Sequence, residues 1–326
     1  MSRAAKSASR CVLVVRLGAM GDILHTLPAV AWLKAKQPDW QLTWLVEPRW
    51  TPLLEGNAAV DRVVQLQRKS LRGLWETGRI LRAGGFESAL DFQGLLKSAI
   101  PAWASGAGER IGFDKSQLRE PQAAMFYTRT ARSESAHVVD RNLDLAAFCA
   151  GLAADNCPRV FPLPAGAAST GLPSGSFVLA SPLAGWGSKQ WPMAHYRVLA
   201  ARLRDELAIP LVLDGPRGAD FSAAEAAIPH YSTLPQLIYA TRRAAAVVGV
   251  DSGPLHLAAA LGKPGVAIFG PTDPARNGPY GGSLRVLRTA GVQTTYKRAS
   301  EIDSSMQSIS PGDVFDVLRA TLVGAE

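Results

Sequence analysis

The sequence has few cysteines and no long hydrophobic run. The first shortage argues against a disulfide-rich protein, and the second against a membrane-spanning one. Only three cysteines occur among 326 residues, which argues against a disulfide framework and favours a reducing compartment, the cytoplasm. The first ten residues, MSRAAKSASR, are basic, but the apolar run after them breaks at Arg16 and again at residues 18–22. This run is too short for the core of a signal peptide or for a membrane span.

Motifs of nucleic-acid recognition are also missing. The sequence shows no aromatic residues interleaved with basic ones, and no helix-turn-helix or zinc-finger spacing. Lys and Arg number 35 against 27 Asp and Glu, which gives a net charge of +8. We therefore expect an anionic partner such as a phosphate, an acidic sugar or an anionic membrane surface, and no nucleic acid.

Length and composition predict two folded domains. A chain of 326 residues with 47% apolar and 19% charged residues exceeds one typical core and is typical of a globular α/β protein. Residues 157–176, rich in Pro, Gly, Ala and Ser, form the candidate linker. We place the domains at residues 1–165 and 166–326. A final helix is expected from Ser310, and one option is that it packs back on the first domain.

Short β-favouring runs alternate with helix-like segments in both halves, which predicts parallel sheets with crossover helices. The expected strands cover residues 11–15, 42–46, 62–66, 88–92, 177–180, 210–213, 245–250 and 266–269. The expected helices cover residues 23–36, 193–207, 234–240 and 255–261. Ligands of such sheets bind at the carboxyl ends of the strands, near helix N-termini, so we expect the functional residues in the strand-to-helix loops.

The first such loop is RLGAMGDILHTLP, residues 16–28. Gly18 and Gly21 allow a tight turn, and Asp22 falls in the first turn of the following helix. A helix cap is the simpler interpretation of an isolated Asp at this place. The loop does not match the GxGxxG dinucleotide motif, so by itself it does not name a reaction.

Two further loops, in the second half, are suited to phosphate. In AGWGSKQWP, residues 184–192, small neighbours let the backbone approach an anion, and Lys189 either neutralises a diphosphate or is a solvated surface lysine. In VDSGPLHLAAALGKP, residues 250–264, Asp251 ends a strand and the next helix points its N-terminus at the turn, which predicts an anion site. His256, in the first turn, either contacts the anion or is structural.

Taken together, these segments resemble the ADP-heptose:lipopolysaccharide heptosyltransferases, glycosyltransferase family 9, from Val12 to about Leu322. The matching segments are MGDILHTLPA (20–29), DFQGLLKSA (91–99), REPQAAMFYTR (119–129), SKQWP (188–192), DSGPLHLAAAL (251–261) and FGPTDP (269–274). The second and third of them favour the members that add the first heptose over those that add the second.

The resemblance implies a GT-B fold: α/β, with two Rossmann-like domains whose parallel sheets face a central cleft. It also implies transfer with inversion from ADP-L-glycero-β-D-manno-heptose to a Kdo residue of Kdo2-lipid A. No metal and no other cofactor is expected. The protein would work in the cytoplasm, in peripheral contact with the inner membrane.

By the same resemblance, Asp22 is the general base. The implied donor-binding residues, in the C-terminal domain, are Lys189, Asp251, Ser252, Gly253, His256, Ala184, Gly185, Asp220 and Ser232. The implied acceptor-binding residues, in the N-terminal domain, are Arg68, Lys69, Arg72, Arg119, Gln93 and Lys97. A solvated basic surface is the alternative for the acceptor-side cations.

The residue types agree with an inverting transfer, which needs one base and a stabilised leaving group. A metal-dependent transferase would show an Asp-x-Asp pair near the nucleotide, and none accompanies the phosphate loops. Three alternatives stay open: the same chemistry on another acceptor, including the second heptose addition; a nucleotide-sugar epimerase of GT-B shape; and a non-catalytic ADP-binding module.

Overall fold

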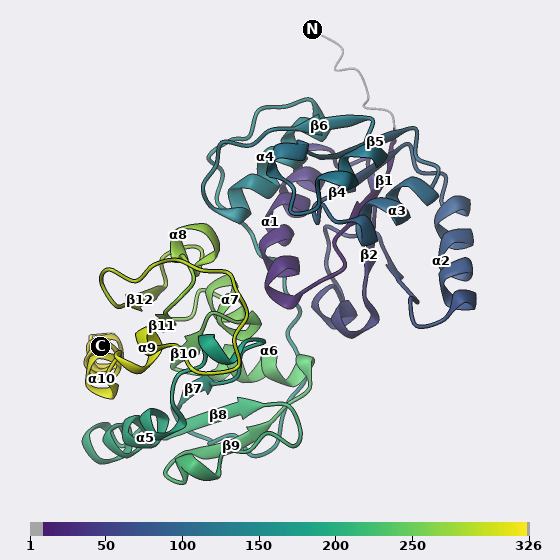
Figure 1. The fold of residues 1–326 in the computed structure, drawn as a ribbon. Helices are drawn as coiled ribbons and strands as arrows, with labels where there is room; N and C mark the ends of the chain where they lie inside the picture. The colour runs from purple at the N-terminus through teal and green to yellow at the C-terminus, as the bar shows by residue number, and fades with distance from the viewer. Residues whose placement is uncertain (1–8, 325–326) are drawn as a thin grey trace, which may run out of the picture. The chain divides into compact units, whose positions relative to one another are not determined.

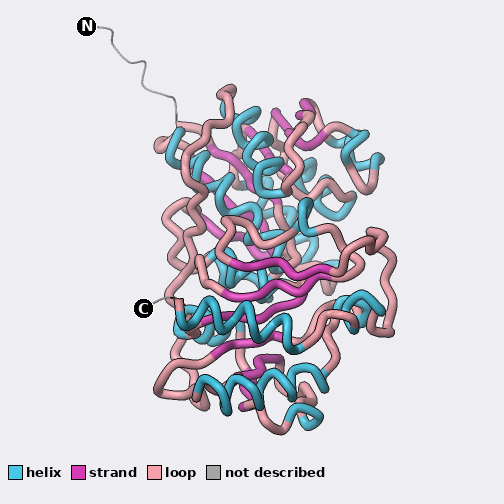
Figure 2. The backbone as a smooth tube through the Cα atoms, turned by 90° about the vertical axis from the view of Figure 1, so that its left-hand side faces the viewer, coloured by secondary structure: helices cyan, strands magenta, loops and turns pink. Residues whose placement is uncertain are grey.

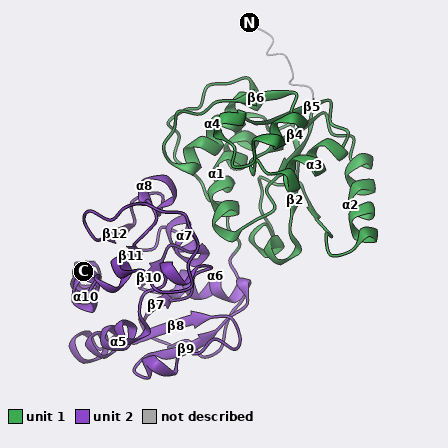
Figure 3. Ribbon diagram, in the orientation of Figure 1, with its two compact units in different colours: residues 1–164 green, residues 165–326 purple. Residues whose placement is uncertain are grey.

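The computed structural model describes residues 9–324 and divides the chain into two compact units, Met1–Pro164 and Ala165–Glu326 (Figure 3). The sequence placed this boundary one residue later. The basic segment at residues 1–8 lies outside the described residues.

A parallel six-stranded sheet forms the first unit, in the order β3-β2-β1-β4-β5-β6 (Figure 1). The strands are β1 (Cys11–Val15), β2 (Gln41–Val46), β3 (Arg62–Gln65), β4 (Ser88–Asp91), β5 (Glu109–Phe113) and β6 (Arg129–Ala131). The helices are α1 (Met20–Lys36), α2 (Leu71–Ala83), α3 (Leu96–Ala104) and α4 (Val138–Ala150), with the short turns η1 (Pro48–Leu53), η2 (Lys115–Gln117) and η3 (Pro121–Phe126).

The second unit repeats this topology with the sheet order β12-β11-β10-β7-β8-β9, again all parallel. Its strands are β7 (Val178–Ser181), β8 (Leu211–Gly215), β9 (Ile228–Tyr231), β10 (Ala246–Val250), β11 (Gly265–Phe269) and β12 (Leu284–Arg288). Its helices are α5 (Met193–Leu207), α6 (Leu234–Arg243), α7 (Gly253–Ala260), α8 (Pro274–Asn277), α9 (Ser304–Gln307) and α10 (Pro311–Val323), with turns η4 (Gly187–Lys189) and η5 (Ser222–Ala224). Both units are therefore Rossmann-like.

Each sheet is buried on both faces because helices cover it on both sides, as Figure 2 shows for the strands of each unit. In the first unit, α1 and α4 pack together on one face. On the other face, Leu13 and Val15 of β1 share a core with Leu81 of α2 and Ala102 of α3. This double covering explains why β1 and β10 are continuous apolar runs in the sequence.

The strongest apolar runs predicted the elements most accurately. β1 matches its expected range, and so does α5. α1 begins three residues before the expected Ile23, because its first turn holds Gly21 and Asp22 and shows no apolar period. Four strands were not predicted, namely β5, β6, β9 and β12. They lie toward the sheet edges, where short or polar sequences suffice.

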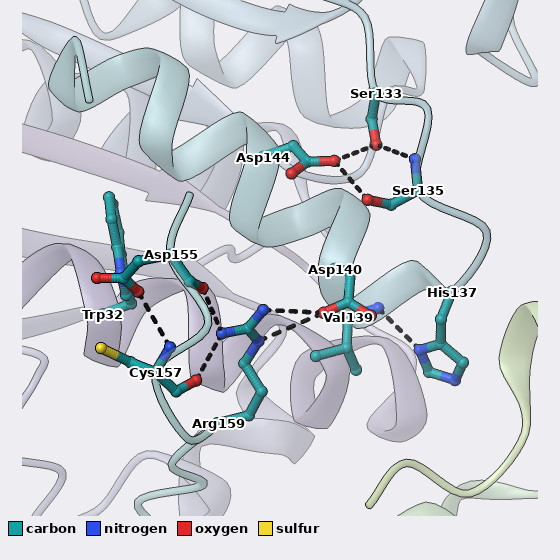
Figure 4. Close-up of polar contacts among 10 residues, drawn as sticks. All are labelled: Trp32, Ser133, Ser135, His137, Val139, Asp140, Asp144, Asp155, Cys157 and Arg159. Atoms are coloured by element: carbon teal, nitrogen blue, oxygen red, sulfur yellow. Dashed lines mark hydrogen bonds and ion pairs between the residues drawn. The ribbon is translucent and has the colours of Figure 1, made fainter. Parts of the chain in front are cut away.

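The predicted linker has no helix or strand between α4 and β7, and its first half is fastened to the first unit (Figure 4). Arg159 pairs with Asp140 of α4 at 3.3 Å and donates to the carbonyl of Cys157 at 2.6 Å. Just before this segment, Asp155 accepts a hydrogen bond from the Trp32 indole at 2.9 Å. The Asn57 amide also donates to the Pro162 carbonyl at 3.1 Å.

The second half of the linker is fastened to the second unit instead. The N–H of Ala167 donates to the Pro235 carbonyl at 2.9 Å, and the Ser169 hydroxyl lies 2.8 Å from Nε2 of the buried His230. The Arg243 guanidinium donates to the carbonyls of residues 173 and 174. Residues up to 162 are thus hydrogen-bonded to the first unit, and residues from 167 onward to the second. The boundary between the two units lies within this interval.

α10 belongs to the core of the second unit. Ser310 caps it, accepting from the N–H of Asp313 at 3.1 Å, as the sequence predicted. Phe315 of this helix is fully buried, and α10 packs on α5 and β11. Packing of α10 on the first domain stays a prediction. Within residues 9–324, no helix is both long and apolar enough to cross a membrane.

Truncating Phe315 is therefore expected to destabilise the second unit. Phe315→Ala should lower its free energy of unfolding by about 3–5 kcal/mol, because a buried ring leaves a cavity. Val323→Ala, on the same helix at a side chain that is 57% exposed, is the control and should change little. Chemical denaturation measures both. Equal losses in the two variants would mean that α10 is not part of this core.

Candidate active site

Asp22 lies in the first turn of α1, where two neighbours hold its carboxylate. Oδ2 accepts a hydrogen bond from the Ala19 N–H at 3.0 Å, and Oδ1 lies 2.9 Å from the Arg16 guanidinium. Ala19 has no side-chain acceptor, so only the Asp22 half of a capping box forms. The Asp22 side chain is nevertheless 43% exposed. Asp22 therefore caps the helix and also presents a carboxylate to solvent, and the two interpretations are compatible.

Arg16 connects the loop after β1 with the loop after β4. Its side chain is only 7% exposed, and its guanidinium donates to the Phe92 carbonyl as well as pairing with Asp22. The Gln93 side chain forms a second connection by accepting from the Leu17 N–H at 2.9 Å. These contacts form because β1 and β4 are parallel neighbours that end at the same sheet edge. Gln93 thus lies beside the Asp22 loop, and its role toward an acceptor stays a prediction.

Asp91, at the end of β4, is a fully buried carboxyl that joins two of the family-like segments. It accepts hydrogen bonds from the Ser98 hydroxyl at 2.8 Å and from the Tyr127 hydroxyl at 2.7 Å. Burial raises the pKa of the Asp91 carboxyl, although the hydrogen bonds from Tyr127, Gln93 and Ser98 oppose that shift. With no exposed surface, Asp91 shapes the site and does not contact a ligand.

A pocket of about 490 Å³ opens in the first unit where β2 and β3 end. The buried Glu47 lies within it, 2.8 Å from the Arg68 guanidinium and 3.1 Å from that of Arg49. Lys69 lines the same pocket. Three cations and one carboxylate leave the lining positive, and both guanidinium groups are more than half exposed. The pocket is therefore suited to an anion.

The remaining acceptor candidates do not line this pocket. Arg72 is 87% exposed on α2 and pairs with Glu76, one helical turn away, at 2.8 Å. Lys97 and Arg119 are also exposed, on α3 and before η3 respectively. The structure thus brings two of the predicted acceptor-side cations into the pocket and leaves these three outside it.

In the second unit, loops from three strands meet around Asp251. Its Oδ2 lies 2.5 Å from the Lys189 ammonium and accepts from the Thr272 hydroxyl at 2.7 Å. Its Oδ1 lies 3.6 Å from Nε2 of His256. Burial alone would raise the pKa of Asp251, but the His256 hydrogen bond and the Lys189 charge outweigh it and hold that pKa well below its usual range. Lys189, Asp251, His256 and Thr272 are called the Asp251 cluster below.

The N-terminus of α7 lies next to this cluster and has unused polar groups. Ser252 is the N-cap residue, and its hydroxyl is buried with no hydrogen-bond partner among residues 9–324. Pro254 has no N–H, so Gly253 and Leu255 supply the free N–H groups of the first turn. A helix N-terminus with free N–H groups and a nearby lysine is suited to a phosphate.

The loop that bears Lys189 is held from the other side by a later segment of the chain. Lys189 lies 4.2 Å from the centre of the Trp186 ring, and Arg298 lies 5.7 Å from it. An added Cβ at Gly187 would overlap the backbone of Ser300, so only glycine allows this approach. The preceding Ala184 and Gly185 offer only backbone groups, as expected from their side chains.

Asp220 and Ser232 use their polar groups locally. Asp220 is exposed and accepts from the Ser222 N–H at 2.9 Å, which shapes the turn before η5. Ser232 hydrogen-bonds the buried Asp214, which also binds Nδ1 of His230 at 2.7 Å. A role for Asp220 or Ser232 toward a ligand stays a prediction.

Sequence reasoning missed four residues that position these groups: Arg16, Glu47, Arg49 and Thr272. Glu47 and Thr272 each follow the carboxyl end of a strand, a signal that was available. Arg16 was noted only because it interrupts an apolar run. Among residues 9–324, no three His, Cys, Asp or Glu side chains lie together in a way that could hold a metal ion.

Comparison with solved structures places the fold among the GT-B glycosyltransferases. The E. coli heptosyltransferase WaaC with ADP matches with a TM-score of 0.79 at 28% identity, covering 95% of this chain and 99% of that chain. The same enzyme with ADP-2-deoxy-2-fluoro heptose matches with a TM-score of 0.76 at 27% identity, over the same shares of the two chains.

Sequence comparison identifies the family. Residues 74–305 match glycosyltransferase family 9 (heptosyltransferase). The chain is 31% identical to lipopolysaccharide heptosyltransferase 1 of Escherichia coli strain K12, over 85% of this chain and 93% of the relative. The corresponding protein of Pseudomonas aeruginosa is 32% identical, over 83% and 82%. This chain belongs to glycosyltransferase family 9.

Removing the Lys189 charge should destabilise the protein in a pH-dependent way. The pKa of Asp251 is lowered in the folded state, so its contribution to stability is present above the unfolded pKa of about 3.9 and is lost as the pH falls through the folded pKa. Without Lys189 the folded pKa rises, and protonation then relieves the unpaired carboxylate. Lys189→Met should therefore cost about 3 kcal/mol at pH 7 and clearly less near pH 3, where Asp251 begins to be protonated in the variant.

The matched control is Lys297→Met, an exposed lysine of the same unit. It should cost little at either pH. Urea denaturation at the two pH values measures both variants. An equal cost of Lys189→Met at both pH values would show that the loss does not come from the charge of Asp251, and no cost at pH 7 would show that the pair does not stabilise the fold.

Proposed function

We propose that this chain transfers L-glycero-D-manno-heptose, with inversion, from ADP-L-glycero-β-D-manno-heptose to a Kdo residue of Kdo2-lipid A, in the synthesis of the lipopolysaccharide inner core. Relatives named lipopolysaccharide heptosyltransferase 1 support the reaction. The neighbours solved with ADP and with an ADP-heptose analogue support the donor. The acceptor is membrane-borne, so the protein would work in peripheral contact with the cytoplasmic face of the inner membrane.

The observation that carries the proposal is the placement of Asp22. Its carboxylate is half-exposed, while the buried Arg16 and the Ala19 N–H hold it in one orientation. Each oxygen keeps a second lone pair, so the carboxylate is able to accept a hydrogen bond from a hydroxyl. In the proposed reaction the acceptor oxygen attacks the anomeric carbon, its proton passes to Asp22, and ADP leaves from the opposite face.

The donor's diphosphate is assigned to the Asp251 cluster and the start of α7. Lys189 would neutralise charge on the leaving ADP, and the N–H groups of Gly253 and Leu255 would bind phosphate oxygens. The unpartnered Ser252 hydroxyl and His256 would add hydrogen bonds. We propose that these groups supply the stabilisation that a metal ion gives in other transferases, so that no metal or other cofactor is required.

The acceptor's anionic groups are assigned to the 490 Å³ pocket. Arg49, Arg68 and Lys69 line it, and the Glu47 carboxylate bridges the two guanidinium groups. Kdo carboxylates and lipid A phosphates are the kind of ligands that such a lining binds. A GT-B epimerase uses no acceptor and would leave this pocket without a role. A transferase that adds the second heptose would use the same base and the same donor-binding residues, and would differ only in the residues that bind the acceptor.

Purified protein should form a heptosylated product from ADP-heptose and Kdo2-lipid A, releasing one ADP per heptose, and should do so in the presence of EDTA. Mass spectrometry of the lipid and an ADP assay measure the two products. Transfer only to an already heptosylated acceptor would identify the second addition instead. Loss of transfer in EDTA that magnesium restores would contradict the proposed metal independence.

Asp22→Asn should lower kcat by about 10²–10⁴-fold, because Asn cannot take the proton. Asn still accepts from the Ala19 N–H, so the helix start survives. The buried Arg16 loses its ion partner, which should cost about 1–2 kcal/mol of stability. Donor binding, measured by titration with ADP, should stay close to that of the wild type.

Asp61→Asn is the matched control. Asp61 likewise combines an ion pair, to Lys34 at 2.9 Å, with a backbone hydrogen bond, from the Leu42 N–H at 2.7 Å. It lies where β2 and β3 begin, at the opposite sheet edge from Asp22. This variant should lose similar stability and keep its turnover. If both variants keep most of their turnover, Asp22 is only a cap and the base lies elsewhere.

A further inference from the structure

α2 and α3 lie side by side in the first unit (Figure 1). Their outer surface carries large exposed apolar side chains that the proposed chemistry does not use. On α2, Leu71 is 86% exposed and Trp75 is 67% exposed. On α3 Trp103 is 57% exposed, and on the neighbouring η3 Met125 is 77% exposed. Singly scattered apolar residues are ordinary on a surface, whereas a cluster of them on neighbouring helices is typical of an interaction site.

A pocket of about 720 Å³ lies between these helices and combines both indoles with three arginines. Trp75 and Trp103 line it together with Arg79, Arg82 and Arg110. The Arg110 guanidinium is fixed in place by hydrogen bonds to the carbonyls of Phe126 at 2.7 Å and Ala107 at 2.8 Å. An added Cβ at Gly106 would overlap the Arg82 guanidinium, which therefore lies directly against the backbone.

The positive charge of this pocket is not neutralised. Across the described range 9–324, no carboxylate lies within ion-pair distance of Arg79, Arg82 or Arg110. The one carboxylate on α2, Glu76, pairs with Arg72. Unpaired guanidinium groups that share a pocket are suited to a phosphate oxygen.

Indole rings at the rim of an arginine pocket suit the boundary between hydrocarbon and headgroups in a bilayer. Trp prefers that boundary, where its apolar body and its N–H are both accommodated. Arginine places its stem along apolar surface and its head among phosphates. Leu71 and Met125 would then reach the acyl region, whereas a protein surface would have to supply an acidic and an apolar patch at once.

We propose that the α2–α3 face is the surface by which this protein docks on an anionic membrane, with a lipid phosphate in the pocket of Arg79, Arg82 and Arg110. The inference rests on the proposed function for one point, the membrane-borne acceptor. It also agrees with the chain order, because Arg68 and Lys69 of the acceptor pocket directly precede α2 at Leu71. Docking of α2 would bring that pocket to the bilayer surface, where the acceptor's sugars emerge.

Vesicle co-sedimentation without donor or acceptor tests the proposal. The wild type should bind vesicles of equal parts phosphatidylglycerol and phosphatidylcholine more tightly than pure phosphatidylcholine, and added salt should weaken the binding. Arg79→Ser with Arg82→Ser should weaken it by roughly 30-fold, and Trp75→Ser with Trp103→Ser by at least about tenfold. Transfer to a water-soluble, deacylated acceptor should stay unchanged in both double variants.

The controls remove the same number of charges, or two other exposed apolar side chains, elsewhere. Arg62→Ser with Arg285→Ser, and Val160→Ser with Tyr296→Ser, all change exposed residues off this face and should bind vesicles like the wild type. Wild-type binding by the α2 and α3 variants would overturn the proposal. So would equal binding to neutral vesicles, or a wild-type dimer that these variants convert to monomers, since that would assign the face to a second copy of the chain.

The outcomes also separate this proposal from the proposed function. If vesicle binding depends on Trp75 and Arg79 but the protein transfers no heptose, the docking surface is supported and the proposed reaction is rejected. If the protein transfers heptose but its vesicle binding does not depend on these residues, the reaction is supported and the docking surface is rejected. Equal loss of transfer to soluble and membrane-borne acceptors in the variants would show that the face acts on the site, and would overturn docking.

Discussion

The parallel arrangement of the strands is the constraint on which both candidate sites depend. In each sheet every strand ends at the same edge, so loops that are distant in the sequence become neighbours there. Leu17 meets Gln93 in this way, and Asp251 meets Thr272. Because the backbone hydrogen bonds of the sheets fix these positions, the loops carry polar side chains without having to fold by themselves.

Both units place a carboxylate between a cation and the start of a helix, but with opposite results. In the first unit the arginine is buried and Asp22 is left half-exposed, so the carboxylate faces solvent. In the second unit the Asp251 side chain is only 10% exposed and already has Lys189, His256 and Thr272 as partners. The first arrangement leaves a base available, whereas the second presents a lysine and helix N–H groups. One fold thereby supplies groups for proton transfer and for phosphate stabilisation.

The sequence predicted the elements whose apolar pattern is dictated by burial on both faces, and it located Asp22, Lys189 and Asp251 because each follows such a strand. It did not predict the ion pair of Glu47 with Arg68, since their meeting depends on the pairing of β2 with β3. Arg72 was placed with Arg68 and Lys69 by the family resemblance, as part of one basic loop. The start of α2 separates them, since Arg72 lies on the helix surface against Glu76.

The two contacts of Arg16 limit which residues position 16 accepts. Its guanidinium reaches the Phe92 carbonyl with one nitrogen and Asp22 with another, from a side chain that is almost fully enclosed. A lysine donates all its hydrogen bonds from one nitrogen, so it would have to lie within reach of both acceptors at once, whereas the planar guanidinium reaches them with two separate nitrogens. Arg298 makes a cation–π contact with the Trp186 ring at 5.7 Å, a kind of contact that lysine also makes. Replacement of arginine by lysine is therefore less easily accommodated at position 16 than at position 298.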